Sequence, residues 1–213
     1  MSVSKEKCPL CQSDYANLYE IKSVNYYKCK NCFGIYMGES FKPDIEKEKL
    51  IYLQHQNDVN DLYYQKFVSP ITRSIGEDFT KDSKGLDFGA GTGPVIAKVL
   101  KDNGYDISIY DPLFHKNESL LETSYDFIAS CEVIEHFHKP YKEFALLKSM
   151  LHNGSKLYCM TEVYSTSIDF SSWYYKNDPS HVFFYHIKTL QWIQKEFGFK
   201  GLKIKGRLIV FSN

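Results

Sequence analysis

The stretch LDFGAGTGP at residues 86–94 constrains the fold of this chain more than any other segment. Apolar residues lead into Asp87, and three glycines follow at alternate positions before a helical pattern begins. Glycine lets the main chain turn tightly and approach a ligand closely. Asp111 ends the next apolar segment, 18 positions after Gly93, where a carboxylate is placed to hold the hydroxyls of a ribose. The pattern predicts a strand, a turn and a helix that bind a nucleoside.

From residue 84 onwards, apolar strand-like segments alternate with segments of helical periodicity. The expected strands are KGLDF, YDISIY, YDFIAS and SKLYCMTEV, and the expected helices are PVIAKVLKDNG, PYKEFALLKSMLHNG and TLQWIQKEFGF. This alternation is typical of a doubly wound, mostly parallel α/β sheet. The last two segments, FKGLKIKG and RLIVFSN, follow each other closely and are predicted to form an antiparallel pair.

The details of the glycine turn indicate which nucleoside derivative it would bind. A dinucleotide site uses the spacing GxGxxG, which GAGTGP does not have. Pro94 suits the first position of a helix. Asp87 would repel a phosphate group but would suit a positively charged ligand. S-adenosylmethionine carries an ammonium, a sulfonium and a ribose, and it has no phosphate.

With these motifs, the chain resembles class I S-adenosylmethionine-dependent methyltransferases over about residues 50–205. The resemblance rests on LDFGAGTGP, IYDP, YDFIASCEVIEHF, HNGSKLYCMT and WIQKEFGF in this order. It is closest to a compact subgroup with an N-terminal zinc ribbon, similar to deoxysugar C-methyltransferases and ubiquinone-biosynthesis O-methyltransferases. It implies a Rossmann-like methyltransferase sheet.

The resemblance also implies a set of cofactor contacts. The methionine end of the cofactor would lie on Asp87, Gly89, Ala90, Gly91 and Gly93. Asp111 would bind the ribose, Pro112 would lie beside the adenine, and Cys131 and Glu132 would close the pocket. Pro112 and Tyr125 are only 13 positions apart, too few for the usual helix, strand and adenine loop. The third strand is therefore expected to be short or missing.

Four of the six cysteines form two CxxC pairs near the N-terminus, namely Cys8, Cys11, Cys29 and Cys32. Two residues between thiolates allow both to reach one tetrahedral ion. About forty residues cannot build a sufficient core, so the metal would supply folding energy. We expect a structural zinc ribbon over residues 1–40, a helical connector that caps the cofactor over 41–80, and the methyltransferase domain over 81–213.

The stretch CEVIEH at 131–136 places Glu132, Glu135 and His136 where a buried strand should end. If a helix begins here, these side chains share one face. With His181 they resemble the magnesium site of small-RNA 2′-O-methyltransferases, which implies a divalent ion such as Mg²⁺. The alternative needs no metal, because acidic residues also favour a helix N-terminus.

Glu135, His136 and His181 are the candidate catalytic residues. His181 is expected either to act as a general base on a substrate hydroxyl or to be a structural histidine in a turn. His186, by contrast, is expected to have a structural role at the start of the last helix.

Four further residues are candidates for substrate contact. His55 and Tyr64 belong to the helical connector, where the alternative is a solvated helix face. Trp173 and Tyr175 are expected to form an aromatic wall, with core packing as the alternative.

Charge and hydropathy limit the partners. Lys plus Arg and Asp plus Glu both number 26, so the formal charge is zero, which argues against a broad nucleic-acid footprint. No apolar run is long enough for a membrane span, and a cytoplasmic protein is expected. The predicted function is methyl transfer from S-adenosylmethionine to a small hydroxyl-bearing metabolite, such as a sugar, a phenol or a natural-product intermediate. The alternatives are a nucleic-acid methyltransferase that binds RNA through its ribbon, and a catalytically silent cofactor-binding module.

Overall fold

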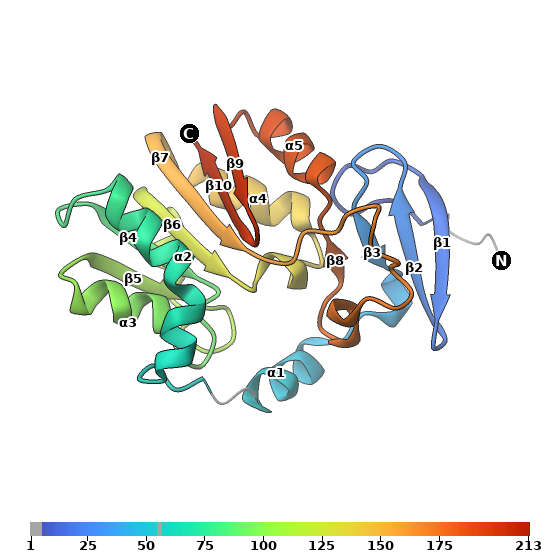
Figure 1. Ribbon diagram of the computed structural model, residues 1–213, viewed down its shortest axis with the longest axis horizontal. Helices are drawn as coiled ribbons and strands as arrows, with labels where there is room; N and C mark the ends of the chain where they lie inside the picture. The colour runs from blue at the N-terminus through green and yellow to red at the C-terminus, as the bar shows by residue number, and fades with distance from the viewer. Residues whose placement is uncertain (1–5, 55–56) are drawn as a thin grey trace.

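Strands in which successive side chains point to opposite faces assemble into one large sheet (Figure 1). The computed structural model describes residues 6–54 and 57–213. The strands of this sheet are β4 (Lys84–Phe88), β5 (Asp106–Tyr110), β6 (Tyr125–Cys131), β7 (Leu151–Met160), β9 (Gly201–Lys205) and β10 (Leu208–Ser212). Their order is β5-β4-β6-β7-β10-β9.

The strand directions agree with the prediction of a mostly parallel sheet. β4 pairs in parallel with β5 and with β6, and β7 is parallel to β6. β10 is antiparallel to both β7 and β9, which confirms the antiparallel pair expected at the C-terminal end. Residues 112–124 lie within the described part of the chain. They contain a 3-10 turn, Glu118–Glu122, and a single bridge from His115 to Asp111, and they add no strand to the large sheet. The expectation that the third strand is short or missing is confirmed.

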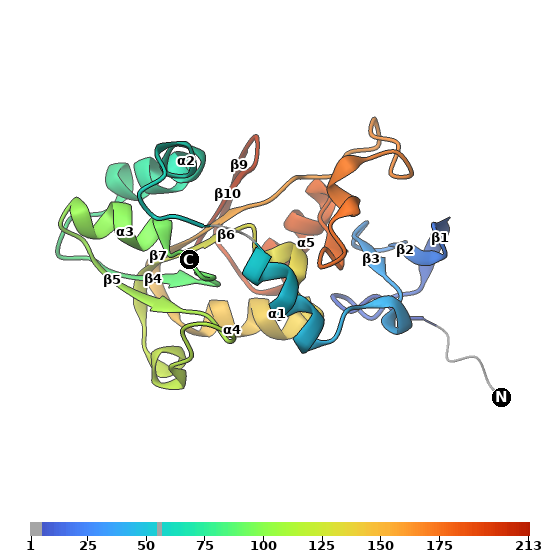
Figure 2. The ribbon, with the colours of Figure 1, turned by 90° about the horizontal axis from the view of Figure 1, so that it is seen from below.

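Helices cover both faces of the sheet, so the doubly wound α/β architecture is confirmed. The helices are α1 (Ile45–Gln54), α2 (Leu62–Asp78), α3 (Val95–Asp102), α4 (Pro140–Ser149) and α5 (Ile187–Glu196). Figure 2 shows α2 and α3 on one side of the sheet and α4 on the other. Along β6, Phe127 and Ala129 pack in the cluster of α2 and α3, whereas Ile128 packs in the cluster of α4 and α5. This alternation is the two-residue period of a strand.

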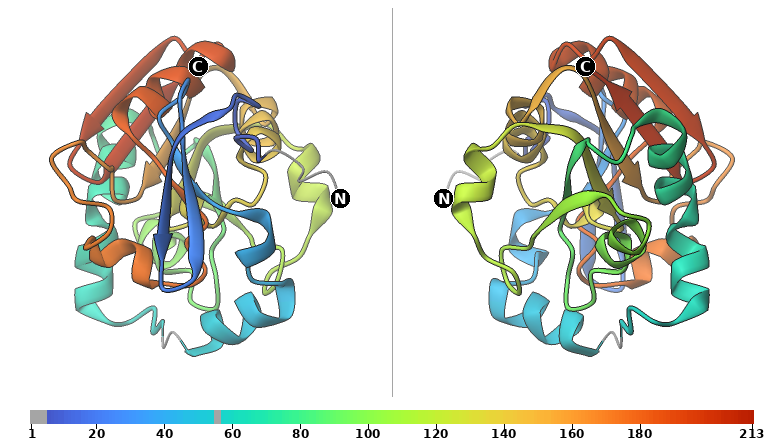
Figure 3. Two further views of the ribbon diagram at one scale, coloured as in Figure 1. Left: turned by 90° about the vertical axis from the view of Figure 1, so that its right-hand side faces the viewer. Right: turned by 90° about the vertical axis from the view of Figure 1, so that its left-hand side faces the viewer.

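The cysteine-bearing part of the chain forms a second, smaller sheet. β1 (Tyr15–Ile21), β2 (Val24–Cys29) and β3 (Ile35–Met37) pair in antiparallel order, and β8 (Phe183–Phe184) adds to β3. The left view of Figure 3 looks onto β1 and β2, with the large sheet behind them. The small sheet is therefore completed by a segment from the C-terminal part of the chain. The bounds of the zinc ribbon, residues 1–40, stay a prediction.

The helical connector expected over residues 41–80 contains two helices, α1 and α2. α2 buries Val68, Ile71 and Ile75 against α3 and the sheet, whereas α1 buries none of its residues fully. α1 lies at the lower edge of the molecule in Figure 1. None of the helices in the described part of the chain combines the length and apolar character that crossing a bilayer requires.

Candidate functional site

A cavity of about 700 Å³ opens at the carboxyl ends of β4, β5 and β6. This is the edge at which open parallel sheets bind ligands. The ends of the three strands contribute Phe88 to Thr92, Tyr110 to Pro112, and Cys131 to Val133. Side chains from α1, α2 and α4 complete the wall. The volume lies in the range of small-molecule and cofactor sites.

The glycine turn forms one wall of the cavity, and its conformation explains the glycines. Gly89 and Gly91 have φ angles of +77° and +60°, in the left-handed region. A Cβ atom on Gly89 would lie 2.5 Å from a Val133 methyl carbon, and one on Gly93 would lie 2.0 Å from the Asn57 carbonyl oxygen. At Gly91, nothing in the described structure lies within 4 Å of the position of such an atom. The turn is therefore closely packed at two glycines and open to the cavity at the third.

Asp111 fastens the glycine turn to the end of β5. Its Oδ2 accepts a hydrogen bond from the Gly91 amide at 2.9 Å. Its Oδ1 accepts from the amides of Leu113 and Phe114, at 2.8 and 3.0 Å. The side chain is buried and lines the cavity together with Ala90 and Pro112. The carboxylate is thus fixed in orientation at the cavity wall.

Asp87 lies differently from the other residues of the turn. It does not line the cavity; its Oδ2 accepts a hydrogen bond from the Ala97 amide at 3.0 Å, in the first turn of α3. Burial raises the pKa of Asp87 to about 7, against the lowering effect of that hydrogen bond. The carboxyl group thus joins β4 to the helix that follows it.

The segment 131–136 does not begin an α-helix, and the interpretation of its acids as an ordinary helix N-terminus is wrong. Ile134–His136 is a single 3-10 turn, and α4 begins only at Pro140. Glu132 has a φ angle of +53°, which a helix cannot contain. Its amide donates to the Met160 carbonyl at 2.8 Å, so the chain continues alongside the end of β7 before it turns.

Glu132 belongs to a network that also includes Arg207, at the turn before β10. Arg207 Nη2 donates to the Glu132 carboxylate and Nη1 donates to Glu162 Oε1 at 2.6 Å. The Tyr175 hydroxyl lies within hydrogen-bond distance of both Glu132 and Glu135, and its single proton can be donated to one of them at a time. Burial raises the pKa of Glu132 and the guanidinium opposes this rise. Sequence reasoning missed Arg207 because it lies in no motif and is 75 positions from Glu132.

Glu135, His136 and His181 bring one ligand atom each within 4.8 Å of one another. Glu135 is fully buried; its Oε1 accepts from Tyr175, and its Oε2 has no hydrogen-bond partner among the described residues. His136 Nδ1 contacts the Ser180 carbonyl at 2.9 Å, and His181 Nδ1 contacts the Tyr175 carbonyl at 2.7 Å.

Because a carbonyl only accepts, Nδ1 is the donor in both rings, and the neutral rings carry their lone pair on Nε2. Burial and nearby His136 lower the pKa of His181 to about 4. His136 and His181 line the cavity, whereas Glu135 does not. Two imidazoles and one carboxylate form a ligand set that leaves coordination positions open and suits iron, manganese or zinc better than magnesium. Glu132 lies outside this group.

The candidate substrate residues are divided between the cavity and the core. Tyr64 lines the cavity. Trp173 is buried against Tyr164, and Tyr175 has its hydroxyl among the carboxylates, so neither lies on the cavity surface. His55 lies outside the described residues. His186 caps the N-terminus of α5, which confirms its expected structural role.

Several cavity residues had no recognisable signal in the sequence. They share the property that they come from helices or from an irregular loop, and they are Glu48, Tyr52, Phe114, Glu143 and Leu146.

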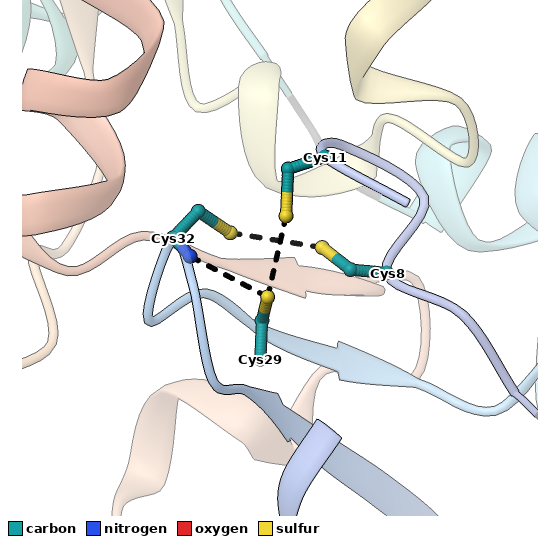
Figure 4. Close-up of side chains that lie close together, drawn as sticks. All are labelled: Cys8, Cys11, Cys29 and Cys32. Carbon is teal, nitrogen blue, oxygen red and sulfur yellow. Dashed lines mark hydrogen bonds between the residues drawn. The ribbon is translucent and has the colours of Figure 1, made fainter. Parts of the chain in front are cut away.

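The four N-terminal cysteines converge in the small sheet (Figure 4). The Sγ atoms of Cys8 and Cys32 are 3.6 Å apart and those of Cys11 and Cys29 are 3.3 Å apart. A tetrahedral ion with Zn–S bonds of about 2.3 Å requires sulfur separations of about 3.8 Å. Amides of Asn31 and Cys32 donate to Cys29 Sγ, as is suitable for a thiolate. The residues present fit a four-thiolate zinc site.

Comparisons with known proteins agree with this architecture. A family model described as "Methyltransferase domain" matches residues 61–204. A search of curated proteins found no match.

Similar solved structures include a SAM-dependent methyltransferase from Archaeoglobus fulgidus, with TM-score 0.53, 20% identity and coverage of 67% of this chain and 76% of that one. Human N-acetylserotonin methyltransferase in complex with SAM has TM-score 0.55 and 12% identity, covering 79% and 56%. An O-methyltransferase family protein from Burkholderia thailandensis has TM-score 0.51 and 13% identity, covering 69% and 55%. The matched region thus spans little more than half of the human and Burkholderia chains. At these identities the likeness shows the fold.

Proposed function

The chain belongs to the methyltransferase domain family, and on that basis we propose that it transfers a methyl group from S-adenosylmethionine to a small hydroxyl-bearing acceptor. A sugar, a phenol or a natural-product intermediate would qualify. One observation carries this proposal: a single cavity joins the glycine turn and Asp111 to His136 and His181. The nucleoside-binding features and the groups that can handle a proton therefore face the same space.

The cavity residues fit the cofactor. Gly91 offers open backbone surface for the methionine end, and the fixed carboxylate of Asp111 has acceptor capacity left for ribose hydroxyls. Cys131 and Glu132 close the end of the cavity at β6. When bound, S-adenosylmethionine supplies a methyl group on a positively charged sulfur. The acidic wall around that position favours binding of a cation.

The protein's own task in the reaction is to orient the acceptor and remove its proton. In-line attack forms the O–C bond as the S–C bond breaks, and the electron pair of that bond goes to sulfur. His181 is neutral at pH 7, is held by the Tyr175 carbonyl through Nδ1, and offers Nε2 as the proton acceptor.

The same residues support a metal-assisted variant of this chemistry. A divalent ion would be held by Glu135, His136 and His181, and it would lower the pKa of an acceptor hydroxyl. The unpartnered oxygen of buried Glu135 supports such an ion. Glu132, also a predicted ligand, is paired with Arg207 instead. Turnover that is lost with a chelator and restored by Mn²⁺ or Fe²⁺, in protein that keeps the zinc on its four cysteines, would establish this variant. Insensitivity to chelation would leave His181 as the proton acceptor.

Charge supports a neutral or cationic acceptor. The cavity wall carries five carboxylates and, in the described part of the chain, no Lys or Arg. The carboxylates belong to Glu48, Asp111, Glu132, Glu143 and Asp178. Phosphate groups would be repelled there, which counts against a nucleic-acid acceptor. We propose a structural zinc on the four N-terminal cysteines, separate from this cavity.

Calorimetric titration with S-adenosylhomocysteine tests the cofactor first, and methyl transfer to a panel of hydroxylated metabolites tests the reaction. We expect one-to-one binding at micromolar concentration and transfer to at least one neutral acceptor. Absence of binding would reject the proposed function. Binding without transfer to any acceptor in the panel would favour the silent cofactor-binding module.

A further inference from the structure

Part of the cavity wall beside Asp111 forms an apolar bay. Phe88, Tyr110, Phe114, Phe137 and Leu146 line it. Phe88 and Tyr110 are stacked with ring centroids 5.4 Å apart, and Phe137 meets Phe88 edge-on at 6.4 Å. Such a wall suits a planar heteroaromatic ring, which gains by burial and by contact with aromatic faces.

The bay contains one carboxylate, that of Glu143 in the first turn of α4. Four of the five cavity carboxylates already have hydrogen-bond partners. Asp111 accepts from backbone amides, and Asp178 accepts from the Ser180 amide. Glu48 pairs with His138, and Glu132 pairs with Arg207. In the described structure, the Glu143 side chain makes no hydrogen bond and no ion pair. A half-buried, unpartnered acceptor in an apolar bay is suited to a ligand that brings a donor.

The missing third strand removes the usual source of polar contacts to an adenine. Of residues 112–124, only Pro112 and Phe114 line the cavity, and neither side chain offers a hydrogen-bond acceptor. In an adenosine held at Asp111, the base is bonded directly to the ribose and must lie in the adjoining bay. α4 contributes Glu143 and Leu146 to the wall of that bay.

We propose that Glu143 accepts a hydrogen bond from the 6-amino group of the cofactor's adenine and thereby selects 6-aminopurine. This inference rests on the proposed use of S-adenosylmethionine. Glu143 would act in recognition of the cofactor and would take no part in the chemical step. Its carboxylate can only accept, so a ligand without the 6-amino donor would leave it unpaired in the bay.

A double-mutant cycle between protein and ligand tests the contact. Calorimetry would compare S-adenosylhomocysteine with its 6-deamino analogue, which carries hydrogen in place of the amino group. The proteins are the wild type, Glu143→Ala, Glu143→Gln and the control Glu122→Gln, whose exposed side chain lies in the 3-10 turn before β6.

We expect the wild type and the control to prefer the amino ligand by about tenfold or more, the usual size for a hydrogen bond to a charged group. Glu143→Ala should bind both ligands equally, and Glu143→Gln, which keeps a carbonyl acceptor, should retain part of the preference. Equal binding of the two ligands by the wild type would overturn the proposal, as would an unchanged preference in Glu143→Ala. If the wild type does not bind S-adenosylhomocysteine at all, the proposed function itself fails.

Discussion

Replacing Asp87 with asparagine should remove a pH dependence from the stability of this protein. Asp87 is 3% exposed, and its carboxylate accepts a hydrogen bond from the Ala97 amide. Burial and the neighbouring Asp111 raise its pKa from 3.8 to about 7, while the Ala97 amide and Lys101 oppose the rise. The folded protein therefore holds a proton on Asp87 that the unfolded chain releases in mild acid.

The sign and size follow from linkage. Because the folded pKa is above the unfolded one, the contribution of Asp87 to stability is fully present below about pH 4 and is lost as the pH rises to about 7, beyond which it no longer changes. Each pH unit in this window costs about 1.4 kcal/mol. Between about pH 5 and pH 7 the loss is about 2 kcal/mol, because the slope declines near the folded pKa; this is a substantial part of a typical folding free energy of about 5–15 kcal/mol.

Urea unfolding, followed by tryptophan fluorescence at about pH 5 and pH 7, measures this loss. The change between the two pH values in Asp87→Asn is subtracted from that in the wild type, so that contributions common to both proteins cancel. A constant cost from the new amide cancels as well. Asp106→Asn, at the exposed start of β5, serves as the control. An identical pH dependence in the wild type and Asp87→Asn would refute the assignment of a raised pKa.

Three further substitutions test the cysteine site and the cavity. Cys8→Ser should lose about one zinc per chain and destabilise the small sheet, whereas Cys159→Ala should keep its zinc; full zinc content in the first variant would exclude the four-thiolate site. His181→Ala should change the affinity for S-adenosylhomocysteine by no more than about twofold and lower turnover by about 10²-fold or more. The control His152→Ala, at an exposed position, should retain activity. Equal turnover in His181→Ala and the wild type would exclude the proposed role of His181. Asp111→Asn should lower the affinity for S-adenosylhomocysteine, measured by calorimetry, by about tenfold or more. An unchanged affinity would show that the ribose binds elsewhere.

The sheet could be predicted from the sequence because its signals are local. Most strands of the large sheet contain a run or an alternation of apolar residues, and most turns carry a glycine or a proline. The short interval between Pro112 and Tyr125 was enough to predict the loss of the third strand, since a strand and its connections need a minimum length of chain. The two CxxC pairs were equally clear, because two residues between thiolates set the reach to one ion.

The site was less predictable because its decisive contacts join distant residues. Glu132 and Arg207 form their ion pair across 75 positions, and nothing in the sequence near Arg207 indicates a partner. The left-handed conformation of Glu132 is likewise invisible in the letters CEVIEH, whose spacing also suits a helix. The spacing of residues determines which of them share a face only when it is known whether the segment is a helix, a strand or a turn.

β8 shows the same limit in the fold. Its two residues, Phe183 and Phe184, have side chains that favour strands but are too few to predict one, and they pair with the edge strand β3 of the small sheet. Local propensity cannot anticipate a strand that exists only through its partner.

The edge pairing also connects the cysteine cluster to the proposed acceptor site. Thr189 donates to the carbonyl of Cys32 at 2.8 Å, and the Met37 amide donates to Val182 at 2.9 Å. The Val182 amide in turn donates to the Glu135 carbonyl at 2.9 Å, directly after His181 in the chain.

A short series of backbone hydrogen bonds thus leads from the small sheet to the Glu135–His136–His181 group, whereas Asp111 is fixed by amides of its own loop and of the glycine turn. Loss of a metal from the cysteines would loosen the edge on which β8 depends, and with it the position of His181. For this reason, the zinc-deficient Cys8→Ser protein should lose turnover before it loses affinity for the cofactor. The small sheet would then be a structural support of the acceptor pocket, which explains why a C-terminal segment returns to complete it.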